Sequence, residues 1–389
     1  MLARLCRQTS SGRFIPEIDG LRFIAIGLVV LYHLQGVVAG RLGLNDAEVS
    51  SDWLLRIGQH GDRGVQLFFA ISGFILGLPF AAHRLAGGPR VNLRQYFWRR
   101  VTRLEPPYFV SMLLVFAGAV LIGGRSATAL APHLAASLAY LHNAIYGVAS
   151  TVNGVAWSLE IEVQFYILVP ALAALFAVRG RLPRRALVAA LAVALMTAQW
   201  YTLSPYGPQR LALSIYAAAQ YFLVGFLLAD VYVVDWGMRP RSEWRWDLVS
   251  LVGWPLAWWL WRDRWLPHLF FPGVIFILYC AAFRGVAVRA FLRNRWIATI
   301  GGMCYTIYLL HFAVIAAFER VLAWVPSTGR PSGDLVVHAL LVLPPLLVVC
   351  AGFFALVERP CMDKDWPRRL KAWAWALRTR RVAGPAAEA

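Results

Sequence analysis

Ten apolar runs divide the chain, each close to 20 residues long and separated from the next by a short polar segment. About 20 apolar residues in a helix cross the roughly 30 Å hydrocarbon core of a bilayer. The pattern therefore predicts an all-α polytopic integral membrane protein with about ten transmembrane helices. They lie near residues 23–40, 64–82, 107–123, 156–178, 186–204, 211–233, 247–262, 267–283, 297–323 and 335–357. The stretch 130–146 is shorter and more polar, so we expect an outer loop or a partly re-entrant segment.

Composition supports a membrane protein and narrows its chemistry. The mean hydropathy is +0.58, and 59% of the residues are hydrophobic against 15% charged, which excludes a soluble globular domain. The net charge of +18 is spread between the apolar runs and does not form one patch, so it does not indicate nucleic acid. The five cysteines lack a disulfide framework or a C-x-x-C metal spacing. We expect no metal and no permanently bound cofactor.

The basic residues also predict orientation. Alternate loops carry 28 Lys and Arg residues on one side and nine on the other. The positive-inside rule then places both termini in the cytoplasm, as an even number of spans requires. We divide the chain into a cytoplasmic arm (1–13), one transmembrane domain (14–360) and a basic cytoplasmic tail (361–389), whose end we expect to be disordered.

Two ionisable residues, Arg22 and His33, bracket ten uncharged residues in the first predicted span. Eleven helical steps make about three turns and a rise of about 16 Å, so both side chains lie on one face. This places Arg22 at the cytoplasmic end and His33 near the midplane, where an ionisable residue is a candidate functional group. The simpler interpretation is a packed, hydrogen-bonded histidine, and the aligned arginine weighs against it.

Three arginines follow the second predicted span on the cytoplasmic side: Arg99, Arg100 and Arg103. Arg100 and Arg103 share a helix face at i, i+3. Guanidinium groups arranged in this way grip phosphate oxygens bidentately, which favours a phosphorylated ligand. A role as stop-transfer charge or in lipid headgroup contact explains most loop arginines and remains open here.

Other polar residues fall inside apolar helices. Glu160 and Glu162 point about 200° apart, so only one can face a shared pocket, and we favour Glu162. Glu160 is better explained as a carboxylate near a helix N-terminus. His311 lies close to the centre of the ninth span, with Tyr305 and Tyr308 on neighbouring turns. A histidine kept neutral by apolar surroundings can accept a proton, as a general base must.

Five motifs occur in order: Arg22-x10-His33, GVQLFFAISGFIL, RRVTRLEPPY, WSLEIEVQFY, and YTIYLLH with VERP at 357–360. With this spacing, residues 14–360 resemble the acyltransferase-3 family of membrane-bound O-acyltransferases, which modify bacterial glycans, exopolysaccharides and macrolides. Cys304 departs from the serine usual before the tyrosine. Some members append a soluble hydrolase-like domain, which we expect this chain to lack.

The resemblance implies an acyl-CoA donor, with acetyl-CoA the expected one, taken from the cytoplasm at a bacterial cytoplasmic membrane. It implies an essential pair at Arg22 and His33, a donor-binding element at Arg100 and Arg103, and a carboxylate at Glu162. We expect His33 to act as the base. Arg22, Glu162 and His311 are the other predicted catalytic residues, and Arg99 and Ser72 complete the predicted donor-binding set. The acceptor would be the hydroxyl of a glycan, a lipid-linked sugar or a macrolide.

A transporter or flippase is the alternative, with His33, Glu162 and His311 relaying protons through the membrane. The sequence shows no inverted repeat to support it, and the Arg-x-x-Arg element has no evident task in it. A combined function, in which only the acyl group crosses the membrane, is a third possibility.

Overall fold

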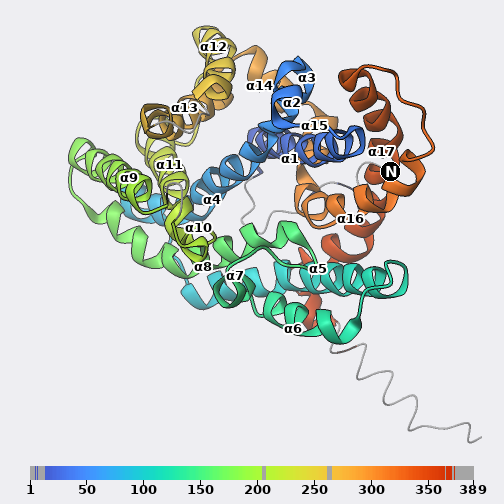
Figure 1. Cartoon of the computed structure of the whole chain (residues 1–389). Coiled ribbons are helices and arrows are strands. Elements are labelled where there is room, and N and C mark those ends of the chain that lie inside the picture. The colour runs from blue at the N-terminus through green and yellow to red at the C-terminus, as the bar shows by residue number, and fades with distance from the viewer. Residues whose placement is uncertain are drawn as a thin grey trace, which may run out of the picture.

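A computed structural model describes residues 5, 7, 14–203, 207–260, 265–363, 365–369 and 372. The described residues form helices and connecting loops without a strand, as expected (Figure 1). Nine described helical segments are long and apolar enough to cross a membrane. They are α1 (Pro16–Leu42), α3–α4 (Trp53–Ala86), α5 (Leu93–Leu121), η3–α8–η4 (Gly154–Ala177), α9 (Arg181–Leu203), α10–α11 (Gln209–Val234), α13 (Trp265–Arg284), α16 (Cys304–Leu322) and α17–η5–α18 (Pro331–Cys361).

These composite segments and the remaining helices have separate bounds. The composite segments contain α3 (Trp53–Gln59), η2 (Gly61–Arg63), α4 (Gly64–Ala86), η3 (Gly154–Ala156), α8 (Trp157–Leu172), η4 (Ala173–Ala177), α10 (Gln209–Ala212), α11 (Ile215–Val234), α17 (Pro331–Phe353), η5 (Phe354–Glu358) and α18 (Arg359–Cys361). The other helices are α2 (Asp46–Ser51), α6 (Ala127–Leu138), α7 (His142–Tyr146), α12 (Arg245–Leu260), α14 (Ala287–Leu292) and α15 (Arg295–Gly302).

Nine of the ten predicted spans are therefore confirmed as membrane-length helical segments. The other run, 247–262, forms α12, a helix of 16 residues that is short for a full crossing. Residues 261–264, which follow it, lie outside the described residues, so a tenth span stays a prediction. The stretch 130–146 forms the short helices α6 and α7, and neither is long enough to cross a bilayer.

Two predicted boundaries were wrong. The helix expected at 107–123 begins at Leu93, because the Asn92 side chain accepts the backbone N–H of Gln95 and caps it there. The three arginines therefore belong to α5 itself. The run 297–323 forms two helices, α15 and α16, which are separated at Met303. A Cβ on Gly301 in α15 would lie 1.7 Å from the Asp19 carbonyl oxygen, so this glycine permits direct backbone contact with α1.

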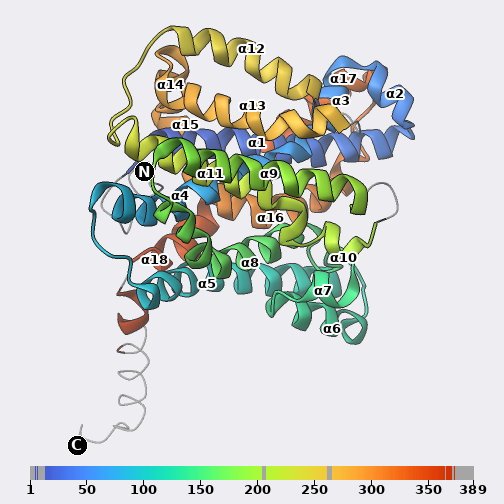
Figure 2. The same cartoon turned by 90° about the vertical axis from the view of Figure 1, so that its left-hand side faces the viewer.

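The helices pack side by side, and the chain enters and leaves the bundle at the same end (Figure 2). We call this the arginine-rich end: here α1 begins, α18 ends, and α5 carries Arg99, Arg100 and Arg103. The helices α2, α6, α7 and α10 lie at the opposite end. A chain that crosses the membrane an even number of times begins and ends on the same side, so this arrangement agrees with ten spans. The assignment of the arginine-rich end to the cytoplasm remains a prediction from loop charge.

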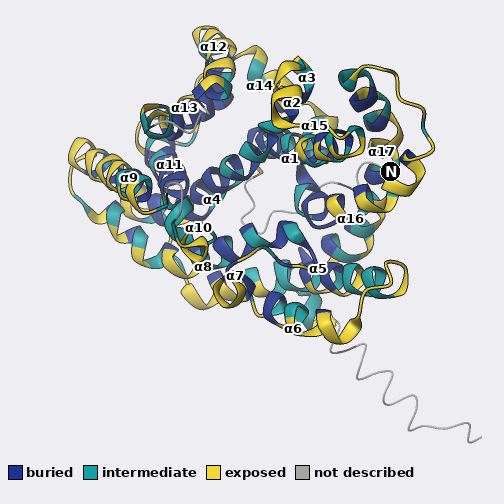
Figure 3. Ribbon diagram, in the orientation of Figure 1, coloured by how far each residue is buried: buried dark blue, intermediate teal, exposed yellow. Residues whose placement is uncertain are grey.

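Many large hydrophobic side chains are exposed, and several polar residues are buried inside the bundle. Figure 3 shows exposed residues in yellow along the outer helices. Leu340, Val348 and Leu356 expose 70%, 71% and 79% of their area on the last segment, although each is hydrophobic. Such exposure is unfavourable in water and favourable against lipid chains. Glu358 and His311 are buried within the bundle instead. The surface therefore supports a multi-pass membrane protein.

Close helix contact forms the frame beside the site. A Cβ on Gly225 of α11 would lie 2.2 Å from the Ala70 carbonyl oxygen of α4, and one on Gly73 of α4 would lie 2.2 Å from the Phe222 carbonyl oxygen. Small residues allow helix backbones in membranes to approach in this way. The stacked rings of Phe165 and Phe222, with centroids 3.8 Å apart, attach α8 to the same pair. The contacts fix α4 and α8, which both carry predicted site residues.

Candidate active site

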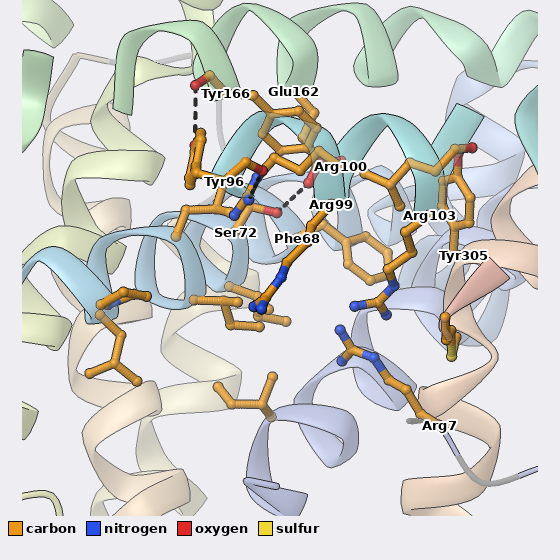
Figure 4. Close-up of a pocket in the computed structure, with 18 of the residues that line it drawn as sticks. Arg7, Phe68, Ser72, Tyr96, Arg99, Arg100, Arg103, Glu162, Tyr166 and Tyr305 are labelled. Atoms are coloured by element: carbon orange, nitrogen blue, oxygen red, sulfur yellow. Dashed lines mark hydrogen bonds between the residues drawn. The ribbon is translucent and has the colours of Figure 1, made fainter. Parts of the chain in front are cut away.

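A cavity of about 860 Å³ lies among α1, α4, α5, α8 and α16, at the arginine-rich end of the bundle (Figure 4). Six of the eight predicted site residues line it: Arg22, Ser72, Arg99, Arg100, Arg103 and Glu162. These residues come from four different helices that are distant in sequence. The structure thus brings the predicted donor-binding set together with Arg22 and Glu162. It places His33 and His311 next to each other but outside this lining.

The three arginines of α5 differ in their surroundings. Arg100 lies over the Tyr96 ring, 3.6 Å from its centroid, and donates to the Tyr96 carbonyl oxygen at 2.8 Å. Arg99 is exposed and extends into the cavity (Figure 4). The Nε of Arg103 is buried and has no hydrogen-bond partner among the described residues. Arg99 and Arg103 are therefore better placed than Arg100 to bind an anion.

Arg22 lies at the start of α1 in a shared ion pair. Its guanidinium is 2.5 Å from the Asp19 carboxylate one turn earlier, and Arg7 reaches the same carboxylate oxygen at 3.1 Å. The Asp19 side chain is only 3% exposed. A buried carboxylate is stable when it is paired and hydrogen-bonded, and here two guanidinium groups pair with it. Asp19 thus orients Arg22 along the cavity wall.

Glu162 faces the cavity, and Glu160 does not line it, as the helical geometry predicted. Ser72 on α4 donates to the Glu162 carboxylate at 2.6 Å. Arg100, which lies over the Tyr96 ring, is also near enough to interact with the charge of this carboxylate. Glu160 is instead buried and accepts the backbone N–H of Asn143 at 2.9 Å, next to the short helix α7. Glu162 therefore connects α4, α5 and α8 at the cavity wall.

The two intramembrane histidines meet across α1 and α16. Their ring centroids are 5.0 Å apart, and Phe312 packs against the other side of His33 at 5.1 Å. The Nδ1 of His311 faces the carbonyl oxygens of Ile307 and Tyr308 at 3.0 and 2.9 Å, so this nitrogen must carry the hydrogen. Its Nε2 then holds a lone pair, which is buried and has no partner in the described part of the chain.

Tyr308 lies between the cavity and the histidine pair. Its side chain lines the cavity, and its ring centroid is 5.8 Å from that of His311. The hydroxyl donates to the Val155 carbonyl oxygen at 2.9 Å and accepts from Ser158 at 2.5 Å. Both bonds hold the ring in place. Tyr308 therefore marks the inner limit of the cavity, nearest to the histidines.

The cavity lining also includes charged residues that sequence reasoning did not select, among them Arg7, Asp19 and Glu358. Glu358 is 2% exposed and accepts from the backbone N–H and the hydroxyl of Thr306 at 3.1 and 2.5 Å. It ends the π-helix η5, a local irregularity that is frequent at functional sites. A carboxylate after a long apolar run was a usable signal, and so was the i, i+3 spacing of Asp19 and Arg22. Nothing in the sequence singled out Arg7.

Together these features define a helical membrane protein with an arginine-lined cavity that ends beside a pair of intramembrane histidines. Residues 15–357 match the family model of the acyltransferase-3 domain, described as an acyltransferase domain. The chain belongs to this family, and the predicted family membership is confirmed.

Two of the relatives have names that state peptidoglycan as the acceptor as well as an O-acetyltransferase activity. Peptidoglycan O-acetyltransferase OatA of Listeria monocytogenes serovar 1/2a is 24% identical over 384 residues, which cover 90% of this chain and 56% of the relative. The Bacillus subtilis protein named "Putative peptidoglycan O-acetyltransferase YrhL" is 26% identical over 420 residues, covering 94% and 59%. The chain thus spans somewhat more than half the length of these relatives. No solved structure matches it.

Proposed function

We propose that this protein transfers an acyl group, acetyl in the first instance, from acyl-CoA to a hydroxyl of a bacterial glycan at the cytoplasmic membrane. Its family and the names of its bacterial relatives support O-acetylation of a glycan, with peptidoglycan the first acceptor to test. The observation that carries the proposal is the cavity itself, whose lining includes Arg22, Arg99 and Arg103 and also Tyr308, the residue that packs against His311 of the histidine pair.

We expect acyl-CoA to bind with its phosphates at the arginine-rich end of the cavity and its thioester toward the histidine pair. Its phosphates would meet the arginines of α5 at the arginine-rich end, because guanidinium groups bind phosphate oxygens bidentately. The pantetheine arm would follow the cavity wall formed by α4, past Ser72 and Phe68, to Tyr308. Arg22 and His33 are separated by a helix rise of about 16 Å, much of which a pantetheine arm can span. The thioester would then arrive next to Tyr308 and His33.

The proposed reaction is an acyl transfer that uses His33 as its base and involves no oxidation or reduction. The acceptor hydroxyl gives its proton to His33 while its oxygen attacks the thioester carbonyl carbon. The tetrahedral intermediate collapses, the C–S bond breaks, and the sulfur leaves and takes the proton from His33. The acetyl ester and CoA are the products, and His33 is neutral again. The buried Nε2 of His311, whose ring centroid lies 5.0 Å from that of His33, is the acceptor that we expect to receive the His33 N–H and so orient the base.

Purified protein in lipid vesicles should release CoA from acetyl-CoA faster when a soluble peptidoglycan fragment is added, and the fragment should gain an acetyl ester. Thiol release and mass spectrometry of the fragment measure the two products. A fragment with methylated hydroxyl groups is the matched control and should not stimulate release. Binding of acetyl-CoA without any release, with or without acceptor, would favour the transporter alternative.

A further inference from the structure

Arg7, which precedes α1 in the predicted cytoplasmic arm, is among the described cations that line the cavity. Its side chain is 13% exposed, so it is largely withdrawn from solvent and lipid headgroups. A Cβ on Gly302 would lie 3.4 Å from the Cβ of Arg7, which shows that Arg7 packs directly on the end of α15. A long charged side chain in such a place requires a polar reason.

The ion pair with Asp19 explains only part of the Arg7 position. One guanidinium nitrogen is 3.1 Å from the carboxylate, but the Nε of Arg7 is buried and has no hydrogen-bond partner among the described residues. The Nε of Arg103 is in the same state. Asp19 already forms an ion pair with Arg22 at 2.5 Å, so its carboxylate would have a partner without Arg7. Arg7 therefore brings a second cation to a carboxylate that one cation already pairs with.

Arg7 and Arg103 face each other across the cavity, with their guanidinium groups turned toward one another (Figure 4). Two cations in this position repel each other, and the nearby carboxylates of Asp19 and Glu358 offset part of that repulsion. With Arg22 included, three guanidinium groups share these two carboxylates, which leaves one positive charge in excess. An anion that accepts hydrogen bonds from both groups would convert this repulsion into attraction. Phosphate matches the geometry, because its tetrahedral oxygens can accept from two planar guanidinium forks at once.

We propose that Arg7 and Arg103 together form a phosphate-binding site for the donor, so that the segment before α1 contributes directly to acyl-CoA recognition. Arg99 extends into the same cavity and is available to a second phosphate group (Figure 4). Arg100, held against Tyr96, shapes the wall instead. The inference rests on the proposed function, because it takes acyl-CoA to be the donor.

The test compares donor affinity in purified Arg7→Gln, Arg103→Gln and double-variant proteins. Arg7→Gln should fold, since Asp19 keeps Arg22 as its partner. Acetyl-CoA affinity should fall between about ten- and 100-fold in each single variant, the range for loss of a charge-assisted hydrogen bond. If both groups grip one phosphate, the double variant should lose clearly less than the product of the two single effects.

Arg94→Gln is the matched control, since Arg94 is exposed in the first turn of α5 and does not line the cavity; its affinity should stay within about twofold of wild type, as expected for an exposed charge. Acetyl-pantetheine, which has no phosphate, should react equally well with wild type and Arg7→Gln. Acetyl-dephospho-CoA, which lacks the 3′-phosphate, identifies the phosphate that Arg7 binds. If wild type and Arg7→Gln bind this donor with equal affinity, Arg7 binds the 3′-phosphate; if Arg7→Gln still binds it more weakly, Arg7 binds the diphosphate. Both results support the site.

Three results would overturn the proposal: unchanged acetyl-CoA affinity in Arg7→Gln, an equal loss with acetyl-pantetheine, or fully multiplicative effects in the double variant. Each would leave Arg7 as a structural partner of Asp19. These results differ from failure of the proposed function, in which the wild-type protein itself would not bind or consume acetyl-CoA.

Discussion

We expect His33→Ala to insert and fold normally and to lose acyl transfer by about 10²–10⁴-fold, the usual contribution of a general base. The His33 ring makes aromatic contacts with Tyr32, His311 and Phe312. Replacing it with alanine makes α1 more apolar and leaves no charge unpaired. Acetyl transfer per folded protein is the measurement, with expression level and melting temperature recorded in parallel.

His338→Ala is a suitable control for loss of a membrane histidine. His338 is buried in α17 and contacts Arg41 at 2.8 Å, remote from the cavity lining. Its loss should reduce stability but leave the transfer rate of the folded protein near wild type. If His33→Ala keeps most of its activity, the base is His311 or another residue, and the proposed mechanism is wrong at that step.

The second large effect concerns the arginines of α5. Lysine at position 100 or 103 keeps the charge but loses the planar fork, so acetyl-CoA affinity should fall without loss of folded protein. We expect Arg103→Lys to lose about tenfold or more. The loss in Arg100→Lys should be smaller, because Arg100 donates to the Tyr96 carbonyl oxygen and lies on its ring. Equilibrium binding of acetyl-CoA to detergent-purified protein measures both.

Arg94→Lys on the same helix serves as the control, and its donor affinity should not change, because Arg94 does not line the cavity. Unchanged acetyl-CoA binding in both Arg100→Lys and Arg103→Lys would return these arginines to a role in membrane topology. In that case another cation of the cavity, such as Arg99, would have to hold the phosphates.

Hydrophobicity predicted most of the fold because a long apolar run has few alternatives to a membrane helix. Helical geometry predicted that only one of Glu160 and Glu162 could face the cavity, since residues two apart point to opposite sides of a helix. Glu162 was favoured because Glu160 is explained by its place near the helix N-terminus. The start of α5 was missed because the cap at Asn92 extends the helix well before its apolar part. The break between α15 and α16 depends on the contact of Gly301 with α1, which only the folded structure shows.

The site was partly predictable for similar reasons. Arg22, His33 and His311 were visible because charge or a histidine is costly inside an apolar helix. Arg103 was visible because of its i, i+3 spacing from Arg100. The sequence could not show which of them line the cavity and which form the adjacent histidine pair, because this depends on how α1, α5 and α16 pack. Arg7 could not be found from sequence, because a basic residue in a terminal segment is ordinary. Its importance comes from Asp19 and Arg103, which the fold brings next to it.

We propose that the donor binds at the arginine-rich end, which loop charge predicts to be cytoplasmic, and that the acceptor reaches His33 from the opposite end, where α2, α6, α7 and α10 lie. Inside-out and right-side-out membrane vesicles test it most directly, with acetyl-CoA and a membrane-impermeant peptidoglycan fragment supplied to chosen faces. The account predicts acetylation when acetyl-CoA is on the cytoplasmic face and the fragment is on the outer face. Acetylation only when both are supplied to the cytoplasmic face would contradict it.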